Sequence, residues 1–444
     1  MLVGGTIVVA AEMRSVPTKH LTALAFSATA GVAVEYYDFF LYGYAAASVF
    51  PAEFFPSLPP RQALVFSYLA FGAGFPARLV GSFIFGHLGD RIGRKSSFLI
   101  GLGLIGGATC STALLPGYAK LGTTAQVLLV VLRMIQGIGL GGEFGGATSL
   151  LAECAGDRRT RAFWISLANL GIPIGAVLAS VALLVSGSSF TGTGWRIAML
   201  CSVVIVIPAA FTRAFLAESP SFDRLKQGGG IERVPSLGVW RAHAPAICLI
   251  ALIGAFQQMD GYVSGTYVIS FMQSAGIPLA TIARLLLLAR VADALGVLLS
   301  GPLADRLGRK RVTVAAIAAT AVLSYPFARA AVSRQLGVLA ALQFLVALGG
   351  IGMLHGLVPM LAADSFPTRY RYSGSGIAFN ASAILGGAVA PPLLAALIGP
   401  DPAGKWVFMP GVYAGYAAIA NVALRFLPAT RTELDVEKGP PARP

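Results

Sequence analysis

Long apolar runs, separated by short polar segments, dominate the pattern of hydrophobic and polar positions along this chain. Twelve such runs can be marked, at about residues 21–50, 62–85, 96–116, 122–152, 162–187, 195–214, 244–274, 280–300, 312–330, 336–362, 373–399 and 404–427. Each is close to or above the ~20 residues that a helix needs to cross a bilayer. Membrane-spanning β-strands are shorter and alternate in polarity, so they are excluded. The pattern predicts an all-α membrane protein with twelve transmembrane helices.

The composition favours a membrane protein over a soluble one. The 444-residue chain is 56% hydrophobic and 12% charged, against roughly 45–50% and about 25% in ordinary globular proteins. A soluble fold could not cover its surface with so few charges, and a disordered chain would be less apolar. The four cysteines lack the spacing of a disulfide framework or a metal site. Because no phosphate loop or HExxH motif occurs, we expect no enzyme, no ATP-driven pump and no cofactor.

The distribution of positive charge predicts the orientation. Most of the 33 lysines and arginines lie near the termini or in five polar segments, 86–95, 153–161, 213–241, 301–311 and 364–371. Basic residues gather in the cytoplasmic loops of membrane proteins. We therefore expect both termini in the cytoplasm and the chain in the inner (plasma) membrane. The net charge of +14 is then a matter of orientation and does not indicate nucleic-acid binding.

The chain divides into two halves that repeat. A polar linker at 215–243 separates a six-helix bundle at 21–214 from a second at 244–427, with cytoplasmic ends at 1–20 and 428–444. GHLGDRIGRK at 86–95 recurs as GPLADRLGRK at 301–310, and four further positions match at an offset of 211: Glu153, Arg158, Asn169 and Gly175 with Asp364, Arg369, Asn380 and Gly386. Parallel six-helix repeats are typical of transporters, whose binding site lies at the repeat interface near mid-membrane.

The doubled loop G-x-L-[GA]-D-R-[IL]-G-R-K resembles the signature of the major facilitator superfamily. VEYYDFFLYGYAAASVFPAEFFP, RMIQGIGLGGEFGGATSLLAE, GWRIAM, ESPSF and FPTRYRYSGSGIAFN resemble its metabolite:proton symporter family. The resemblance covers about residues 20–430. It implies proton-coupled carriage of 2-oxoglutarate, citrate, other dicarboxylates, shikimate, or proline and glycine betaine. Asp260 and the Arg290/Asp293 pair depart from the family pattern, in helices 7 and 8.

The repeated loop is a candidate cytoplasmic gate. Its acidic, basic and glycine residues could form ion pairs that hold the cytoplasmic helix ends together in one state and break in the other. The alternative is that its charges only set the topology. The candidate gate residues are Gly86, Asp90, Arg91, Gly93, Arg94 and Lys95, with Asp305, Arg306, Gly308 and Arg309 in the second half.

Charged residues inside the predicted spans are candidates for proton coupling, because burying a charge in the bilayer is costly. At ~1.5 Å per residue, Asp38 and Arg133 lie at matching depths, and so do Glu143 and Arg78. Glu35 lies about one turn from Asp38. We expect Asp38, Glu35 or Glu143 to carry the proton, with Asp38 and its partner Arg133 favoured. Fixed structural pairing is the alternative.

The candidate substrate ligands are Arg78, Tyr37, Asn169, Asp260 and Asn380. Arg78 could bind a carboxylate of the substrate, or could instead pack helices or pair with Glu143. A local i, i+3 pair is expected for Arg290 and Asp293, and a packing role for His355.

We therefore expect proton symport of a small organic acid by alternating access, by a monomer in the lipid bilayer. A proton symporter of a zwitterionic osmolyte such as proline or betaine, and a drug/proton efflux antiporter, remain alternatives.

Overall fold

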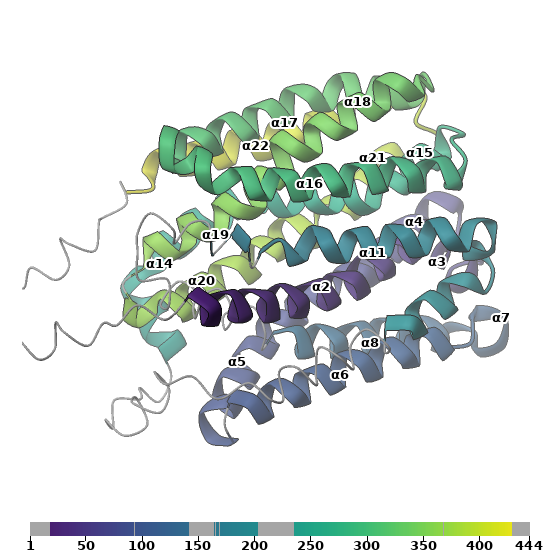
Figure 1. Cartoon of the computed structure of the whole chain (residues 1–444). Coiled ribbons are helices and arrows are strands. Elements are labelled where there is room, and N and C mark those ends of the chain that lie inside the picture. The colour runs from purple at the N-terminus through teal and green to yellow at the C-terminus, as the bar shows by residue number, and fades with distance from the viewer. Residues whose placement is uncertain are drawn as a thin grey trace, which may run out of the picture.

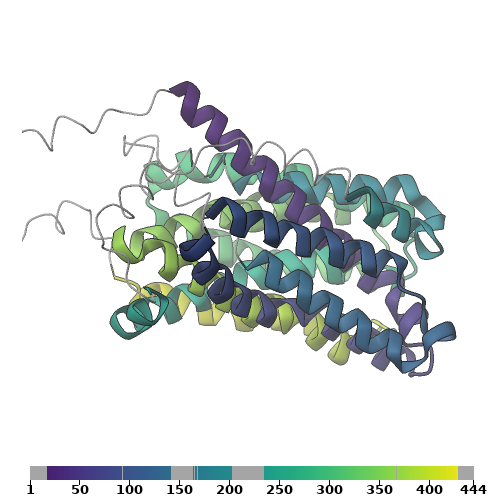
Figure 2. The same cartoon turned by 90° about the horizontal axis from the view of Figure 1, so that it is seen from below.

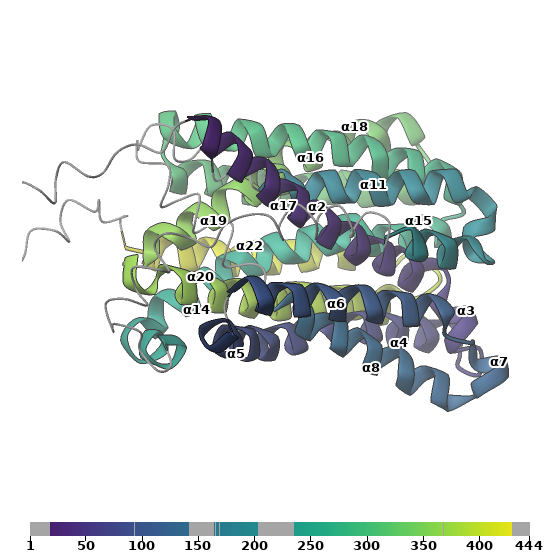
Figure 3. The ribbon, with the colours of Figure 1, turned by 60° about the horizontal axis from the view of Figure 1, so that its bottom comes forward.

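The computed structural model describes residues 18–92, 94–141, 164, 166–167, 169–202, 235–366 and 368–428, and every regular element in these ranges is a helix. The long helices run roughly along one common direction (Figure 1). α2 crosses its neighbours obliquely, as Figures 2 and 3 show from two other sides. Seven helices within the described ranges are long and apolar enough to cross a membrane by length and composition.

The N-terminal half begins with the long α2. Later in this half, α4 (Pro60–Gly72) and α5 (Gly74–Ile92) follow each other with one residue between them. Its elements are α2 (Thr18–Ser48), α3 (Phe50–Phe54), α4 (Pro60–Gly72), α5 (Gly74–Ile92), α6 (Arg94–Leu114), α7 (Tyr118–Leu121), α8 (Thr123–Leu140), α11 (Gly171–Ser186) and the short 3₁₀-helix η1 (Gly187–Thr191). A further helical stretch covers residues 194–202.

Three of the long helices in the C-terminal half contain a π-helical stretch. Its elements are α14 (Pro235–Tyr262), η2 (Val263–Tyr267), α15 (Val268–Ser274), α16 (Leu279–Leu307), α17 (Arg309–Val332), α18 (Leu336–Val346), η3 (Ala347–Gly352), α19 (Met353–Ser365), α20 (Thr368–Ser382), η4 (Ala383–Ala388), α21 (Ala390–Ile398) and α22 (Phe408–Phe426). The π-helices are η2, η3 and η4. Such bulges are common at functional sites.

Two equivalent glycines show the repeat in the packing. A Cβ on Gly175 of α11 would lie 2.3 Å from the carbonyl oxygen of Ala33 in α2. A Cβ on Gly386 of η4 would lie 2.3 Å from the carbonyl oxygen of Ala255 in α14. Only glycine permits backbones to approach so closely, which is how small residues support packing between membrane helices. The sequence match between these positions therefore reflects the same helix contact in each half.

Among the described elements, the two halves meet where α4 packs on α21, α5 on α20, α2 on η2 and α15, and α11 on α16. Near the ends of α4 and α15, the Tyr68 and Ser270 hydroxyls lie 2.7 Å apart and share a hydrogen bond across the interface. Arg61 donates to the carbonyl of Ala396 in the same region. Gly43 of α2 lies against Thr266 of η2. This end of the interface is closed by direct contacts.

Candidate functional site

Aromatic side chains from both halves fill the middle of the interface. Phe39 of α2 lies 5.1 Å and 5.3 Å from Phe71 and Phe75, measured between ring centroids. Tyr262, at the end of α14, lies 5.2 Å from Phe39 and 5.0 Å from Phe75. The Phe39–Phe71 and Phe75–Tyr262 contacts are edge-to-face and the other two are tilted. Aromatic contacts at these distances are favourable. The buried Arg133, Arg78 and Glu35 lie near this cluster.

Arg78 of α5 forms an ion pair with Glu35 of α2, with 2.8 Å between Nη2 and Oε1. Both side chains are almost fully buried, at 2% and 4% exposure. The guanidinium also lies 5.6 Å from the Phe379 ring of α20, which belongs to the other half. Sequence depth had paired Arg78 with Glu143, but the structure gives Arg78 the carboxylate of Glu35, and Glu143 lies outside the described residues. Arg78 therefore lies where the two bundles meet.

Asp38 and Arg133 belong to one hydrogen-bonded chain, as their matching depths predicted, although two side chains separate them. Thr109 of α6 donates to Asp38 Oδ2 at 3.1 Å, and Gln136 of α8 donates to Thr109 at 3.0 Å. Arg133 donates to the Gln136 carbonyl oxygen at 2.6 Å and to the Phe71 backbone at 3.1 Å. The expected Asp38–Arg133 pair is thus an indirect one.

Aromatic rings surround the Arg133 guanidinium. Its central carbon lies 4.3 Å from the ring centroids of Phe39 and Tyr42, and 4.8 Å from that of Phe71. Cation–π contacts of this kind stabilise a buried cation. These contacts stabilise the positive charge of Arg133 in addition to its indirect link to Asp38.

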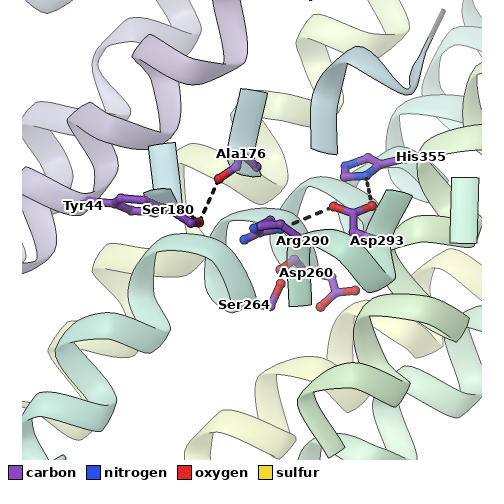
Figure 4. Close-up of polar contacts among 8 residues, drawn as sticks. All are labelled: Tyr44, Ala176, Ser180, Asp260, Ser264, Arg290, Asp293 and His355. Atoms are coloured by element: carbon purple, nitrogen blue, oxygen red, sulfur yellow. Dashed lines mark hydrogen bonds and ion pairs between the residues drawn. The ribbon is translucent and has the colours of Figure 1, made fainter. Parts of the chain in front are cut away.

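A second charged cluster lies inside the C-terminal bundle (Figure 4). Arg290 and Asp293 of α16 form the predicted i, i+3 pair, with 3.4 Å between Nη1 and Oδ2. His355 of α19 places Nδ1 3.0 Å from the other oxygen of Asp293. All three side chains are buried. His355 is therefore hydrogen-bonded, as its expected packing role requires, but its partner is an ionisable group.

Asp260 adds another acid to this region. Tyr413 of α22 donates to Asp260 Oδ1 at 3.0 Å, and Ser264 donates to the Asp260 backbone carbonyl at 2.6 Å. Asp260 itself is 0% exposed. Figure 4 shows Asp260 close to Arg290 and Ser264.

A cavity opens beside these charges, within the C-terminal bundle. Its polar lining is Ser264, Arg290, Ser324, Gln343 and Tyr413, and apolar residues such as Phe327 complete it. The side-chain amide of Gln343 is buried, and neither its nitrogen nor its oxygen has a hydrogen-bond partner among the described residues. Buried polar groups normally have a partner or an ordered water. The cavity is therefore suited to an ordered water that bonds to Gln343.

The remaining candidate substrate ligands differ in where their polar groups point. Tyr37 donates to the Ala198 carbonyl at 2.9 Å, so its hydroxyl links α2 to the helical stretch 194–202 inside the N-terminal bundle. This hydrogen bond gives Tyr37 a packing role, and its role as a substrate ligand stays a prediction. Asn169 and Asn380 are each 2% exposed. The Oδ1 atom of Asn380 has no hydrogen-bond partner among the described residues, and it stays a candidate ligand.

The second copy of the candidate gate is described, and the first is not. For Gly86, Asp90, Arg91, Arg94 and Lys95 the structure describes only the helical backbone. Gly93 lies outside the described residues. In the second half, α16 ends at Leu307 because Gly308 adopts φ +90°. Asp305 and Arg306 are exposed.

Arg309, which begins α17, forms an ion pair with Asp364 near the end of α19. Asp364 is the repeat equivalent of Glu153, and it was not among the candidate gate residues. Arg309 of the charged loop therefore pairs with an acid on another helix, Asp364, and not with Asp305 of the loop itself.

Several polar side chains of the site were not predicted. Thr109, Gln136, Gln343 and Tyr413 are polar residues within apolar runs, and polarity inside a span was a signal that could have included them. The described residues contain no group of three or more His, Cys, Asp or Glu that could hold a metal ion. The site residues that the structure describes are held by ion pairs and hydrogen bonds.

Comparison with known proteins agrees with this architecture. Residues 28–391 and 250–443 match the family model described as Major Facilitator Superfamily. The chain is 31% identical over 382 residues to a shikimate transporter of Escherichia coli (strain K12), covering 84% of this chain and 87% of that protein. It is 35% identical to the inner membrane metabolite transport protein YhjE of the same organism, covering 82% and 85%.

A third relative carries a different name, the ectoine/proline transporter ProP of Corynebacterium glutamicum (strain ATCC 13032). It is 31% identical, covering 94% of this chain and 86% of that protein. Among solved structures, a D-xylose-proton symporter superposes with a TM-score of 0.70 at 18% identity, covering 93% of this chain and 98% of that one. The predicted fold of twelve transmembrane helices in two six-helix bundles is confirmed. The chain, a multi-pass membrane protein, belongs to the Major Facilitator Superfamily of transporters.

Proposed function

We propose that this transporter carries a small carboxylate-bearing metabolite together with a proton, by alternating access. The observation that supports this most is the ion pair between Arg78 and Glu35, 2.8 Å long and buried between the two bundles. A guanidinium offers parallel N–H donors that match a carboxylate, and it remains charged in any environment the protein provides. Arg78 is therefore a suitable ligand for the carboxylate of a metabolite.

The same pair supplies a physical basis for coupling. A solute carboxylate that binds Arg78 competes with Glu35 for the guanidinium. Glu35 then loses its counter-ion while it stays in a buried position, and a buried carboxylate without a partner favours its protonated form. Solute and proton binding would thus promote each other, as symport requires.

Asp38 is the second candidate for the proton in the N-terminal bundle. Its Oδ2 atom accepts a hydrogen bond from neutral Thr109, whereas Oδ1 has no hydrogen-bond partner among the described residues. Arg133 balances its charge through Gln136 and Thr109 without direct contact. Protonation of Asp38 would therefore not require that an ion pair be broken.

Uptake by purified transporter in proteoliposomes tests the proposed function. We would compare 2-oxoglutarate, citrate and shikimate with proline, ectoine and glycine betaine, under an inward pH gradient with and without a protonophore. We expect accumulation of at least one organic acid, and loss of that accumulation when the protonophore is added. The proposal would be contradicted if the protonophore left the accumulation unchanged. It would also be contradicted if the transporter carried none of the organic acids tested.

A zwitterionic solute is the second candidate. Asp260 and Asp293 bring two carboxylates into the C-terminal bundle, which would suit a cationic group, and one relative is named an ectoine/proline transporter. The same panel separates the two functions. Accumulation of proline or betaine in preference to every acid would favour the zwitterion.

We further propose that both termini and the 215–243 linker face the cytoplasm of the inner membrane. The support is the concentration of basic residues in that linker and in the other segments on its side. A reporter fused at Gly229 should be active only in the cytoplasm. Activity on the opposite side of the membrane would reverse the orientation.

A further inference from the structure

The buried charges of the two bundles are balanced differently. In the N-terminal bundle, the described buried arginines, Arg78 and Arg133, match the two buried acids, Glu35 and Asp38. In the C-terminal bundle, the described buried acids are Asp260 and Asp293, both 0% exposed, whereas the described buried arginine is Arg290. The formal charge there is negative by one unit while His355 is neutral. An uncompensated charge in a low-dielectric interior is unfavourable.

His355 is placed to correct this imbalance. Its Nδ1 atom lies 3.0 Å from Asp293 Oδ1, while Arg290 approaches the other oxygen only at 3.4 Å. Figure 4 shows both contacts converging on the one carboxylate. On the opposite side of the ring, Nε2 faces Gly261 of α14, where a Cβ would still be 3.9 Å away. The glycine leaves room beside the second ring nitrogen.

We infer that Asp293 and His355 form a proton-binding pair in the C-terminal bundle, separate from the acids of the N-terminal bundle. One proton enters the pair and converts the imidazole to an imidazolium, which then compensates the Asp293 carboxylate. When the proton leaves, the neutral imidazole and the carboxylate remain, and Arg290 alone offsets the two acids. No other bond forms or breaks.

The part of the chain that the structure describes places few other charged or titratable groups near the pair. Among the described residues, Arg290 of the same helix contacts Asp293, and Asp260 of α14 lies close to Arg290 (Figure 4). Tyr413 of α22 donates to Asp260. Tyr44 of α2 lies beside Ser180, on the side of Arg290 away from the pair (Figure 4). The cavity contributions of α17 and α18 include Ser324 and Gln343, which carry no charge. Asp260 accepts a hydrogen bond from the Tyr413 hydroxyl at Oδ1, whereas its Oδ2 has no hydrogen-bond partner among the described residues, so Asp260 is the competing site for this proton.

Arg290 links the pair to the cavity and to the solute, because it contacts Asp293 and also lines the cavity. Arg290 lines the cavity, and two of its guanidinium nitrogens, Nε and Nη2, have no hydrogen-bond partner among the described residues. The same guanidinium lies 4.7 Å from the Phe40 ring centroid of α2, so it reaches the interface between the bundles. An anion bound there would draw Arg290 away from Asp293. The proton affinity of the Asp293–His355 pair would then rise, because Asp293 would have lost its other positive partner.

This inference rests on the proposed proton symport, and the number of protons carried per solute tests it. The measurement uses purified full-length transporter in proteoliposomes that enclose a pH-sensitive dye, with radiolabelled solute counted in parallel. The solute is the acid that the uptake panel identifies. The variants are Asp293→Asn, His355→Gln and the double substitution, and the matched controls are Asp401→Asn, in an exposed loop, and His243→Gln, near the start of α14.

We expect each single variant and the double variant to carry one proton fewer per solute than the parent, because the two side chains hold one proton together. A gradient of ~1 pH unit contributes about tenfold accumulation for each coupled proton, so accumulation should fall by about that factor. Solute counterflow without a gradient should persist, and both controls should match the parent.

Three outcomes would overturn the inference. An unchanged proton count in Asp293→Asn and His355→Gln would place the coupling proton elsewhere, while the parent's symport stood. Loss of counterflow together with accumulation in both single variants would show that the pair serves packing. A parent that moves solute with no proton at all would remove the proposed function itself, and the inference with it.

Discussion

Asp38 and Arg133 are joined by a relay of two neutral side chains, Thr109 and Gln136. The three hydrogen bonds of the relay measure 3.1, 3.0 and 2.6 Å from the acid to the arginine. The relay links α2, α6 and α8, which carry these residues. A change in the charge of Asp38 can therefore be transmitted to Arg133, and to the aromatic cluster around it, through hydrogen bonds that must reorient.

Breaking the relay at Thr109 should weaken proton coupling. Thr109→Val keeps the shape of the side chain and removes the donor to Asp38. A hydrogen bond to a charged group contributes about 1.5–3 kcal/mol, so accumulation driven by a pH gradient should fall about tenfold or more. The measurement is gradient-driven uptake beside counterflow in the same proteoliposomes.

The matched control is Thr112→Val, because Thr112 lies one turn further along α6 and donates only to the Ala108 carbonyl of its own helix. Thr109→Ser should retain the parent's behaviour. Equal accumulation in Thr109→Val and the parent would show that the relay has no part in coupling.

Arg78→Lys should weaken solute binding although the charge is kept. A lysine cannot present two parallel donors to a carboxylate. We expect the apparent KM to rise about tenfold or more, since charged hydrogen bonds of about 1.5–3 kcal/mol are lost. Arg78→Ala should be at least as impaired. Kinetics of the identified acid give the measurement.

Arg425→Lys serves as the control, because Arg425 is exposed at the end of α22. If Arg78→Lys and Arg78→Ala bind the solute as the parent does, Arg78 holds α5 against α2 and α20, and Arg290 becomes the first candidate for the anion.

The ion pair between Arg309 and Asp364 should stabilise one state of the transport cycle. It ties the start of α17 to the end of α19, at the end of the bundle that carries the charged loop. Asp364→Asn should change the rate of exchange between states more than it changes solute affinity. Counterflow rate and solute affinity, measured on the same variant, separate the two effects.

A charge exchange, Arg309→Asp with Asp364→Arg, should recover part of the lost rate. Arg311→Gln, an exposed arginine on the same turn of α17, is the control for a simple loss of positive charge. An Asp364→Asn variant that transports at the parent's rate would leave this loop with a topological role.

The equivalent glycines should be equally intolerant of a side chain. Gly175→Ala and Gly386→Ala would each place a Cβ 2.3 Å from a backbone carbonyl oxygen of the neighbouring helix. Overpacking of this kind costs about 1–3 kcal/mol. We expect a lower melting temperature for both variants in thermal unfolding of the purified protein.

Gly103→Ala is the control, because a Cβ at Gly103 meets nothing within 4 Å. It should leave the melting temperature unchanged or raise it slightly, since alanine is the better helix former. A loss of stability in Gly103→Ala equal to that in Gly386→Ala would contradict the packing explanation.

Much of the architecture was predictable because it depends on local properties of the chain. The length of an apolar run decides whether a helix can cross a bilayer, so the spans could be marked without knowledge of their neighbours. The Arg290–Asp293 contact follows from helical spacing, since positions i and i+3 lie on one face. The equivalence of Gly175 and Gly386 was visible as a repeat in the sequence.

Contacts between helices needed the tertiary structure. Distance along a span gives the depth of a residue, which correctly grouped Asp38 with Arg133. Depth does not give the rotation of a helix about its axis or its tilt, and these decide which face meets which neighbour. For that reason Arg78 pairs with Glu35, Tyr37 turns toward Ala198, and Asp293 is shared between Arg290 and His355. The partners of the buried charges are set by the packing of side chains far apart in the chain, which no single run of residues encodes.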